Sequence, residues 1–105
     1  MDPLFIVQQC YEKLPANMRA EPWKATGHGK NELQNEDQLN AYIAAYGEMH
    51  IIKCRAALQN FPFEELQNNS FEIIDWGCGQ GIATLTLLDM LFDRKLSANL
   101  RKITL

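Results

Sequence analysis

The sequence predicts an α/β fold in which amino-terminal helices are followed by the first strand–helix–strand unit of a parallel sheet. Two observations support this prediction. Apolar residues recur at helical spacing between prolines in residues 1–66. In residues 67–105 the pattern changes to a short β-branched run, a glycine-rich turn, an apolar helix and a second such run, and a helical crossover of this kind joins parallel strands. We therefore expect an amino-terminal helical segment, residues 1–66, and the start of a sheet domain, residues 67–105.

Prolines mark the first helix and the segment after it. Asp2 followed by Pro3 is typical of a helix N-cap with proline in the first turn, and Pro15 ends the apolar repeat that follows. Residues 15–33 contain proline and glycine but no period, so we expect a loop with one helical turn. Trp23 in this loop is expected to anchor it to the core.

A long helix is expected next. Asn35 and Gln38 stand three residues apart, as in a capping box, and Pro62 prevents the helix from continuing beyond about residue 60. The apolar face of this helix is predicted from the residues that recur at helical spacing. These residues are Leu39, Tyr42, Ile43, Tyr46, Met49 and His50.

The sheet domain begins with residues 71–76, which are rich in β-branched and aromatic side chains and follow a polar turn. Residues 82–93 are predicted to form a strongly apolar helix, and residues 100–105 to begin a second strand. Two strands alone lack the neighbours and the cover on both faces that parallel sheets have. We therefore expect a truncated sheet whose exposed strand edge favours self-association.

Residues 75–81, with the sequence DWGCGQG, are the part of the chain from which a function can be inferred. Glycine at every second position lets the backbone turn sharply out of the strand and approach a ligand without an intervening Cβ. Free N–H groups at the start of the next helix favour an anionic group at the same place. Asp75 stands at the carboxyl end of the strand, where open α/β sheets bind ligands and where a carboxylate can accept hydrogen bonds from an ammonium group. An anion beside a cation describes the amino-acid end of a ligand.

Residues 73–81 resemble motif I of the class I, Rossmann-like S-adenosylmethionine-dependent methyltransferases, which consists of a hydrophobic strand, an acidic residue and G-x-G-x-G. The resemblance extends over roughly residues 71–105. It implies a Rossmann-like sheet, S-adenosylmethionine as the cofactor, and a loop backbone that packs against the methionine part of that cofactor, with Asp75 helping to hold the amino group. The cofactor-binding residues that it implies are Asp75, Trp76, Gly77, Cys78, Gly79 and Gly81. It indicates no catalytic residue, no metal site and no class of methyl acceptor.

Three alternatives stay open beside this resemblance. A dinucleotide-dependent oxidoreductase is less favoured, because its fingerprint places a small third residue where Ile82 stands. A binding module of the same fold without catalysis is the second, and a glycine-rich turn without any ligand is the third. In the family an acidic residue after the second strand binds the ribose hydroxyls, and none is present up to Leu105. We therefore expect weak cofactor binding and no catalysis from this chain by itself.

Composition restricts the partners, the cysteine chemistry and the cellular location that we expect for the protein. A formal net charge of −3 indicates no polyanion-binding surface, although it leaves a nucleic-acid acceptor open. Cys10, Cys54 and Cys78 are widely spaced and odd in number, so they predict neither a disulfide framework nor a zinc site. No signal peptide and no apolar run of membrane-spanning length is recognised, so we expect a cytoplasmic protein without a membrane partner.

Several side chains have both a structural and a functional interpretation. Tyr42 and Tyr46 either pack in a core, which we favour, or line a pocket. His50 continues their face and is more typical of a core histidine than of a base. Cys78 has no identifiable histidine partner that would make it a nucleophile, so packing is favoured there too. Trp76 contacts either the ligand or the long helix, and the sequence does not decide between the two.

Overall fold

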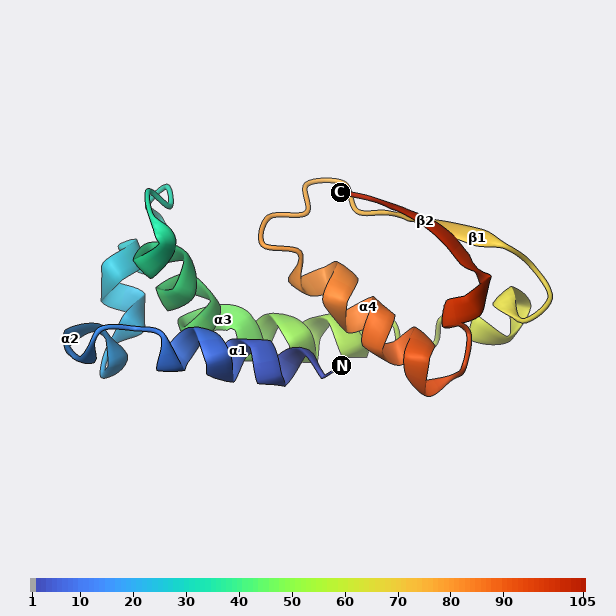
Figure 1. The fold of residues 1–105 in the computed structure, drawn as a ribbon, viewed down its shortest axis with the longest axis horizontal. Coiled ribbons are helices and arrows are strands. Elements are labelled where there is room, and N and C mark those ends of the chain that lie inside the picture. The colour runs from blue at the N-terminus through green and yellow to red at the C-terminus, as the bar shows by residue number, and fades with distance from the viewer. Residues whose placement is uncertain (1) are drawn as a thin grey trace. The chain divides into compact units, whose positions relative to one another are not determined.

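The computed structural model describes residues 2–105 and is a mixture of helices and a two-stranded parallel sheet, which is the α/β class in its coarse sense (Figure 1). The chain divides into two compact units, residues 2–50 and residues 51–105, which we call the helical unit and the sheet unit. In chain order the elements are α1 (Pro3–Glu12), α2 (Ala16–Arg19), η1 (Pro22–Thr26), α3 (Glu36–Ala57), η2 (Phe63–Leu66), β1 (Phe71–Ile74), α4 (Ile82–Asp93), η3 (Ser97–Asn99) and β2 (Leu100–Thr104), where η denotes a 3₁₀ helix.

Both long helices of the helical unit begin at the predicted caps. The Asp2 carboxylate accepts a hydrogen bond of 3.0 Å from the backbone N–H of Leu4, which satisfies one of the free donors at the start of α1. At the start of α3 the Asn35 side-chain oxygen accepts a 2.9 Å bond from the Gln38 N–H. The Gln38 side chain accepts in return from the N–H of Gln34, one residue before the position that a capping box uses. The predicted helix starts are confirmed.

Small and branched apolar side chains fill the interior of the helical unit. Its buried residues include Cys10, Leu14, Ala41 and Ile43. The segment expected to be a loop with one helical turn contains two short helical pieces, α2 and η1. Trp23, expected as an anchor, is an exposed residue, and the buried residues of η1 are instead Pro22 and Thr26. The Thr26 hydroxyl donates to the Trp23 carbonyl oxygen at 3.0 Å, which stabilises η1 by a local hydrogen bond.

The predicted apolar face of α3 is wrong in part. Leu39 and Met49 are 37% and 45% exposed, whereas Ala41 and Ile51 are completely buried. Apolar residues surround most of the circumference of this helix, so their spacing does not single out one stripe. The buried stripe is set by which neighbours the helix meets. Gly47 faces Val7 of α1, and close approach of the two helices within the helical unit fixes that side as interior.

In the sheet unit β1 pairs with β2 in parallel, as predicted, through the crossover helix α4 (Figure 1). The predicted strand at residues 71–76 is shorter in the structure and ends at Ile74. The ladder nevertheless reaches one residue further, because the Asp75 N–H donates to the Thr104 carbonyl oxygen at 2.8 Å. Asp75 is thus fixed by its backbone to the carboxyl end of the sheet.

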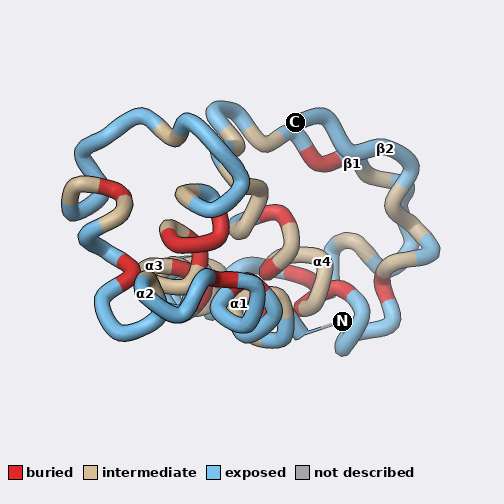
Figure 2. Tube along the Cα trace, turned by 60° about the vertical axis from the view of Figure 1, so that its left-hand side comes forward, coloured by how far each residue is buried: buried red, intermediate tan, exposed pale blue. Residues whose placement is uncertain are grey.

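The core of the sheet unit lies between one face of β1 and the inner side of α4, where Figure 2 shows buried stretches of both elements. Its buried members are Phe63, Ile73, Met90, Leu91 and Leu96. Successive side chains of a strand point to opposite faces, so Ile73 is buried while Ile74 is 69% exposed. One face of the sheet is therefore packed against the core, and the other face is exposed. None of the described helices has the length and apolarity to cross a membrane.

Two polar interactions hold this core in place. Arg55, near the end of α3, pairs with Asp89 of α4 at 3.3 Å. The Asn99 side-chain amide donates to the carbonyl oxygens of Leu66 and Gln67, each at 2.8 Å, and so joins η3 to the region of η2. The Asn99 contacts position the start of β2, which lies beside Phe71 at the amino end of β1.

Candidate functional site

Residues 75–81 leave β1 as an open loop whose three glycines all have left-handed backbone angles. Their φ values are +68° at Gly77, +53° at Gly79 and +77° at Gly81. Residues with a Cβ adopt this conformation only at a cost of about 1–2 kcal/mol, so glycine is the natural residue at each position. The loop makes a second turn before α4 begins, closed by a 2.8 Å bond from the Gly81 N–H to the Cys78 carbonyl oxygen.

The space beside these glycines is empty of protein. A Cβ placed at Gly77, Gly79 or Gly81 would have no neighbouring atom within 4 Å, apart from adjacent residues. The backbone of the loop is therefore accessible and is not packed under side chains of the described residues. A ligand can reach the peptide groups of the loop directly.

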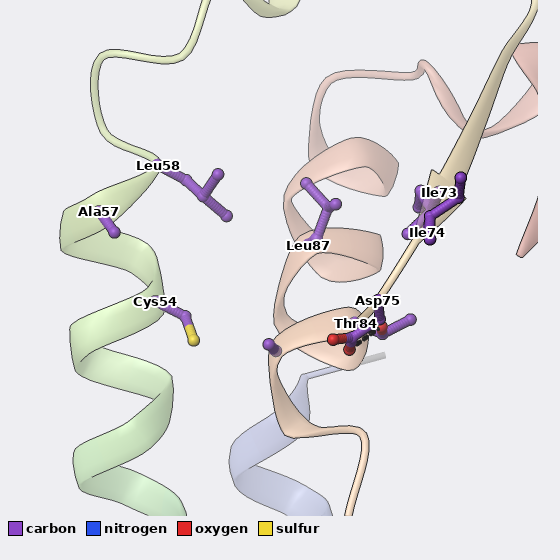
Figure 3. Close-up of a pocket in the computed structure, with 9 residues that line it drawn as sticks. Cys54, Ala57, Leu58, Ile73, Ile74, Asp75, Thr84 and Leu87 are labelled. Carbon is purple, nitrogen blue, oxygen red and sulfur yellow. Dashed lines mark hydrogen bonds between the residues drawn. The ribbon is translucent and has the colours of Figure 1, made fainter. Parts of the chain in front are cut away.

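Asp75 is held at the junction of the strand, the loop and the helix. Besides its backbone bond to β2, its carboxylate accepts a 2.5 Å hydrogen bond from the hydroxyl of Thr84 in the first turn of α4 (Figure 3). The Asp75 side chain is half-buried, and Thr84 is buried, 6% exposed. The carboxylate is thus oriented by a neighbour and still reaches the surface.

The first turn of α4 presents backbone donors next to this carboxylate. The N-cap position is Gly81, which has no side chain and makes no side-chain capping bond. The N–H groups of the first turn have no partner inside the helix and carry the positive end of its dipole. An anionic group is favoured here, a short distance along the chain from Asp75, which favours a cation.

Two pockets border Asp75. One, the strand-end pocket, has a volume of about 320 Å³ and is lined by Ile74, Asp75, Trp76, Gly77, Thr104 and Leu105. It lies at the carboxyl ends of both parallel strands, where open α/β sheets bind their ligands. Its size is at the lower end of the range for small-molecule sites, about 300–1,000 Å³.

The other pocket, which we call the helix pocket, has a volume of about 280 Å³ and lies among the end of α3, β1 and α4 (Figure 3). Its lining is almost entirely apolar, with side chains such as Cys54, Leu58 and Leu87 and with the Asp75–Thr84 pair on one side. The strand-end pocket fits polar chemistry better, because it includes the loop backbone and the ends of both strands.

The sequence-predicted site residues lie together in this one loop, but their side chains differ in what they contact. Trp76 is 93% exposed and lies neither on the long helix nor on the core. Cys78 is half-buried and its thiol faces the Gly79 carbonyl oxygen at 3.7 Å. Asp75 is the one charged side chain of the group, so it carries the electrostatic part of the site.

Tyr42, Tyr46 and His50 form a row on α3 within the helical unit. The ring centres of the two tyrosines are 5.1 Å apart, and those of Tyr42 and His50 are 6.1 Å apart. A Cβ at Gly29 would lie 3.5 Å from the Tyr46 ring, so the turn after η1 packs on that ring. These contacts fit the structural interpretation of the tyrosines.

Thr84 is the site residue that sequence reasoning missed. It stands nine positions after Asp75, and the two meet only because the loop brings the start of α4 back beside the end of β1. A signal is present in the sequence nonetheless. Thr84 and Thr86 interrupt the apolar run of residues 82–88, and a buried hydroxyl in an apolar helix requires a hydrogen-bond partner.

Among residues 2–105 no group of three or more histidine, cysteine or acidic side chains is arranged to bind a metal ion. Comparisons of this chain with protein-family models, with curated proteins and with solved structures found no match.

Proposed function

We propose that this chain binds S-adenosylmethionine through residues 75–81 and forms the cofactor-binding part of a class I, Rossmann-like methyltransferase. The observation that carries the proposal is the glycine loop itself. Three glycines in left-handed conformation border open space, beside a fixed carboxylate and the uncapped start of a helix. A turn that served only to connect β1 to α4 would not require glycine at three alternate positions with nothing packed against any of them.

The arrangement fits the amino-acid end of the cofactor. An α-amino acid carries an ammonium group and a carboxylate on one carbon, so a suitable site has an acceptor and donors close together. Asp75 supplies the anionic acceptor, and the loop and the first turn of α4 supply backbone N–H donors. Glycine at each alternate position permits contact between the ligand and the backbone.

When bound, S-adenosylmethionine would supply a methyl group on a sulfonium sulfur: a nucleophile of the acceptor would bond to the methyl carbon as its bond to sulfur breaks, and the sulfur would leave as a neutral thioether. The residues of this chain act on binding and orientation. Holding the donor in one position removes the entropy that a free reactant would lose on the way to the transition state. Asp75 and the loop backbone fix the end of the donor, and Trp76, exposed beside them, can cover it.

The test is a titration of the chain with S-adenosylmethionine by calorimetry, comparing the wild type with Asp75→Ala. Loss of a charge-assisted hydrogen bond is worth about 1.5–3 kcal/mol, so we expect binding to weaken at least tenfold. Asp93→Ala is the matched control, because Asp93 is an exposed carboxylate at the far end of α4, away from the loop. This control is expected to bind like the wild type.

Three results would contradict the proposal. The first is a wild-type chain that does not bind S-adenosylmethionine, and the second is equal binding by the wild type and Asp75→Ala. The third is tight binding of NADH without any response to S-adenosylmethionine, which would favour the dinucleotide-dependent oxidoreductase. Binding must be measured with the folded variants, so each variant is first compared with the wild type by circular dichroism.

A further inference from the structure

Beyond the binding loop, we infer that Thr84 is a positioning residue: its hydroxyl fixes the Asp75 carboxylate in the orientation that receives the ammonium group of the ligand. This inference rests on the proposed function. It concerns a side chain outside the loop, on the buried side of α4, which makes no contact with the strand-end pocket itself.

The geometry of the pair carries the inference. A carboxylate only accepts hydrogen bonds, so in the 2.5 Å contact the Thr84 hydroxyl donates and Asp75 accepts through Oδ2. Hydrogen bonds to a charged acceptor are shorter and stronger than neutral ones. Within residues 2–105 this is the only side-chain hydrogen bond that the Asp75 carboxylate makes, so Thr84 alone sets the rotation of that group.

The contrast with Thr86 shows that the bond is specific to its position. Thr86 is also buried and lies two residues further along α4, but its hydroxyl donates to the Ile82 carbonyl oxygen at 2.8 Å, which is the usual partner of a threonine inside a helix. Thr84 makes no such bond to its own helix and reaches across to Asp75 instead. Its side chain is therefore committed to the site rather than to the helix.

The hydrogen bond matters for binding because Asp75 borders two pockets. Asp75 lines both the strand-end pocket and the helix pocket, so the side chain could turn toward either. The bond to Thr84 fixes Oδ2 against α4 and leaves Oδ1 for a ligand. Fixing the carboxylate beforehand lowers the entropy that would otherwise be lost when the ligand binds.

The experiment compares Thr84→Val, which replaces the hydroxyl by a methyl group of similar size, with the matched control Thr86→Val. Thr84→Ser retains the hydroxyl and should restore the wild-type behaviour. Thr84→Ala is a second test variant that places no methyl group against the carboxylate, in case Thr84→Val does not fold. The readout is a titration of each full chain followed by nuclear magnetic resonance, which detects weak binding.

Two probes separate positioning from general structural damage. S-adenosylmethionine carries the amino-acid end that Asp75 would hold, whereas 5′-methylthioadenosine shares its nucleoside and sulfur but lacks that end. We expect Thr84→Val and Thr84→Ala to bind S-adenosylmethionine about tenfold more weakly, the equivalent of about 1.4 kcal/mol, and 5′-methylthioadenosine as the wild type does. Thr84→Ser and Thr86→Val should bind both probes as the wild type does.

Each of the other outcomes would contradict either the positioning role of Thr84 or the proposed function. Equal loss of both probes in the Thr84 variants would assign Thr84 a structural role only. Unchanged binding of S-adenosylmethionine in these variants would show that Asp75 needs no positioning. A wild-type chain that does not bind S-adenosylmethionine would overturn the proposed function itself, and the role of Thr84 with it.

Discussion

The helical unit and the sheet unit each contain three of the six glycines of the chain, and they use them differently. In the helical unit a Cβ at Gly47 would lie 2.7 Å from the Val7 side chain, and a Cβ at Gly27 would lie 2.5 Å from the Asn31 side chain. In the sheet unit a Cβ at Gly77, Gly79 or Gly81 would meet nothing within 4 Å. The space beside the glycines of the helical unit is occupied by other side chains, and the space beside the loop glycines is open.

This difference separates structural glycines from candidate ligand-binding ones. A glycine whose missing side chain is replaced by a neighbour is explained by packing, because a larger residue would collide with that neighbour. The loop glycines have no such explanation within residues 2–105. Their left-handed angles explain why glycine is favoured, but they do not explain why the space beside all three is open.

The largest expected effect on stability comes from adding a side chain at a glycine that is packed against a neighbour. Gly47→Val places two methyl groups where Val7 already lies, and overpacking of this kind typically destabilises by about 1–3 kcal/mol. Urea unfolding should show a lower midpoint for Gly47→Val, and the additional change Val7→Ala should restore part of it. Ala56→Val, at an exposed position of the same helix, is the control and should change the unfolding free energy by less than about 0.5 kcal/mol. A Gly47→Val protein as stable as the wild type would show that the contact is not tight.

Filling a loop glycine should have a smaller effect on stability and a larger one on binding. Gly79→Ala forces a side chain into a left-handed conformation, which costs about 1–2 kcal/mol locally, but it meets no neighbour. The new methyl group projects into the space that we assign to the ligand, so S-adenosylmethionine should bind at least tenfold more weakly. Gly29→Ala, which makes the same substitution at a left-handed glycine of the helical unit, outside residues 75–81, is the control for calorimetry. Undiminished binding by Gly79→Ala would remove the loop backbone from the site.

The smallest expected effect is a pH dependence of stability that arises in the helical unit, at Cys10. Burial of Cys10 in the helical unit raises the pKa of its thiol above the ordinary value of 9.0, and the positive charge of Lys13 opposes this only in part. The unfolded chain therefore releases this proton at a lower pH than the folded chain does. The stability that the neutral thiol contributes is complete below about pH 9 and is lost as the pH rises through the folded pKa.

Urea unfolding at several pH values from about 8 to about 10.5 measures this contribution. Cys10→Ala should reduce the loss of unfolding free energy with rising pH, and Cys54→Ala, at a half-buried cysteine, should leave the profile closer to that of the wild type. Identical profiles for Cys10→Ala and the wild type would show that burial does not control the ionisation of this thiol.

The sequence predicted most of the sheet unit because its signals are local. Glycine at alternate positions after a β-branched run, followed by an apolar helix, defines the strand, the loop and the crossover without knowledge of distant contacts. Caps at Asp2 and Asn35 placed the starts of α1 and α3 for the same reason. Residue type alone predicted a loop backbone that a ligand can approach without an intervening Cβ, and the space beside Gly77, Gly79 and Gly81 is open in the structure.

What the sequence could not predict depends on contacts between distant residues. The buried stripe of α3 differs from the predicted one at Leu39 and Met49, because apolar residues surround the helix and neighbours choose among them. The bond from Thr84 to Asp75 joins residues nine positions apart across a turn whose path no local pattern specifies. The missing part of the site is therefore the part that orients the charged side chain.

The central claim is that the open glycines of the sheet unit receive a ligand. Backbone amide resonances of glycine are readily distinguished by nuclear magnetic resonance, so all six positions can be followed during a titration with S-adenosylmethionine. We expect the signals of Gly77, Gly79 and Gly81 to shift together and saturate, while that of Gly47, enclosed against Val7, stays in place. Loop signals that do not move, or that move no more than that of Gly47, would contradict the central claim.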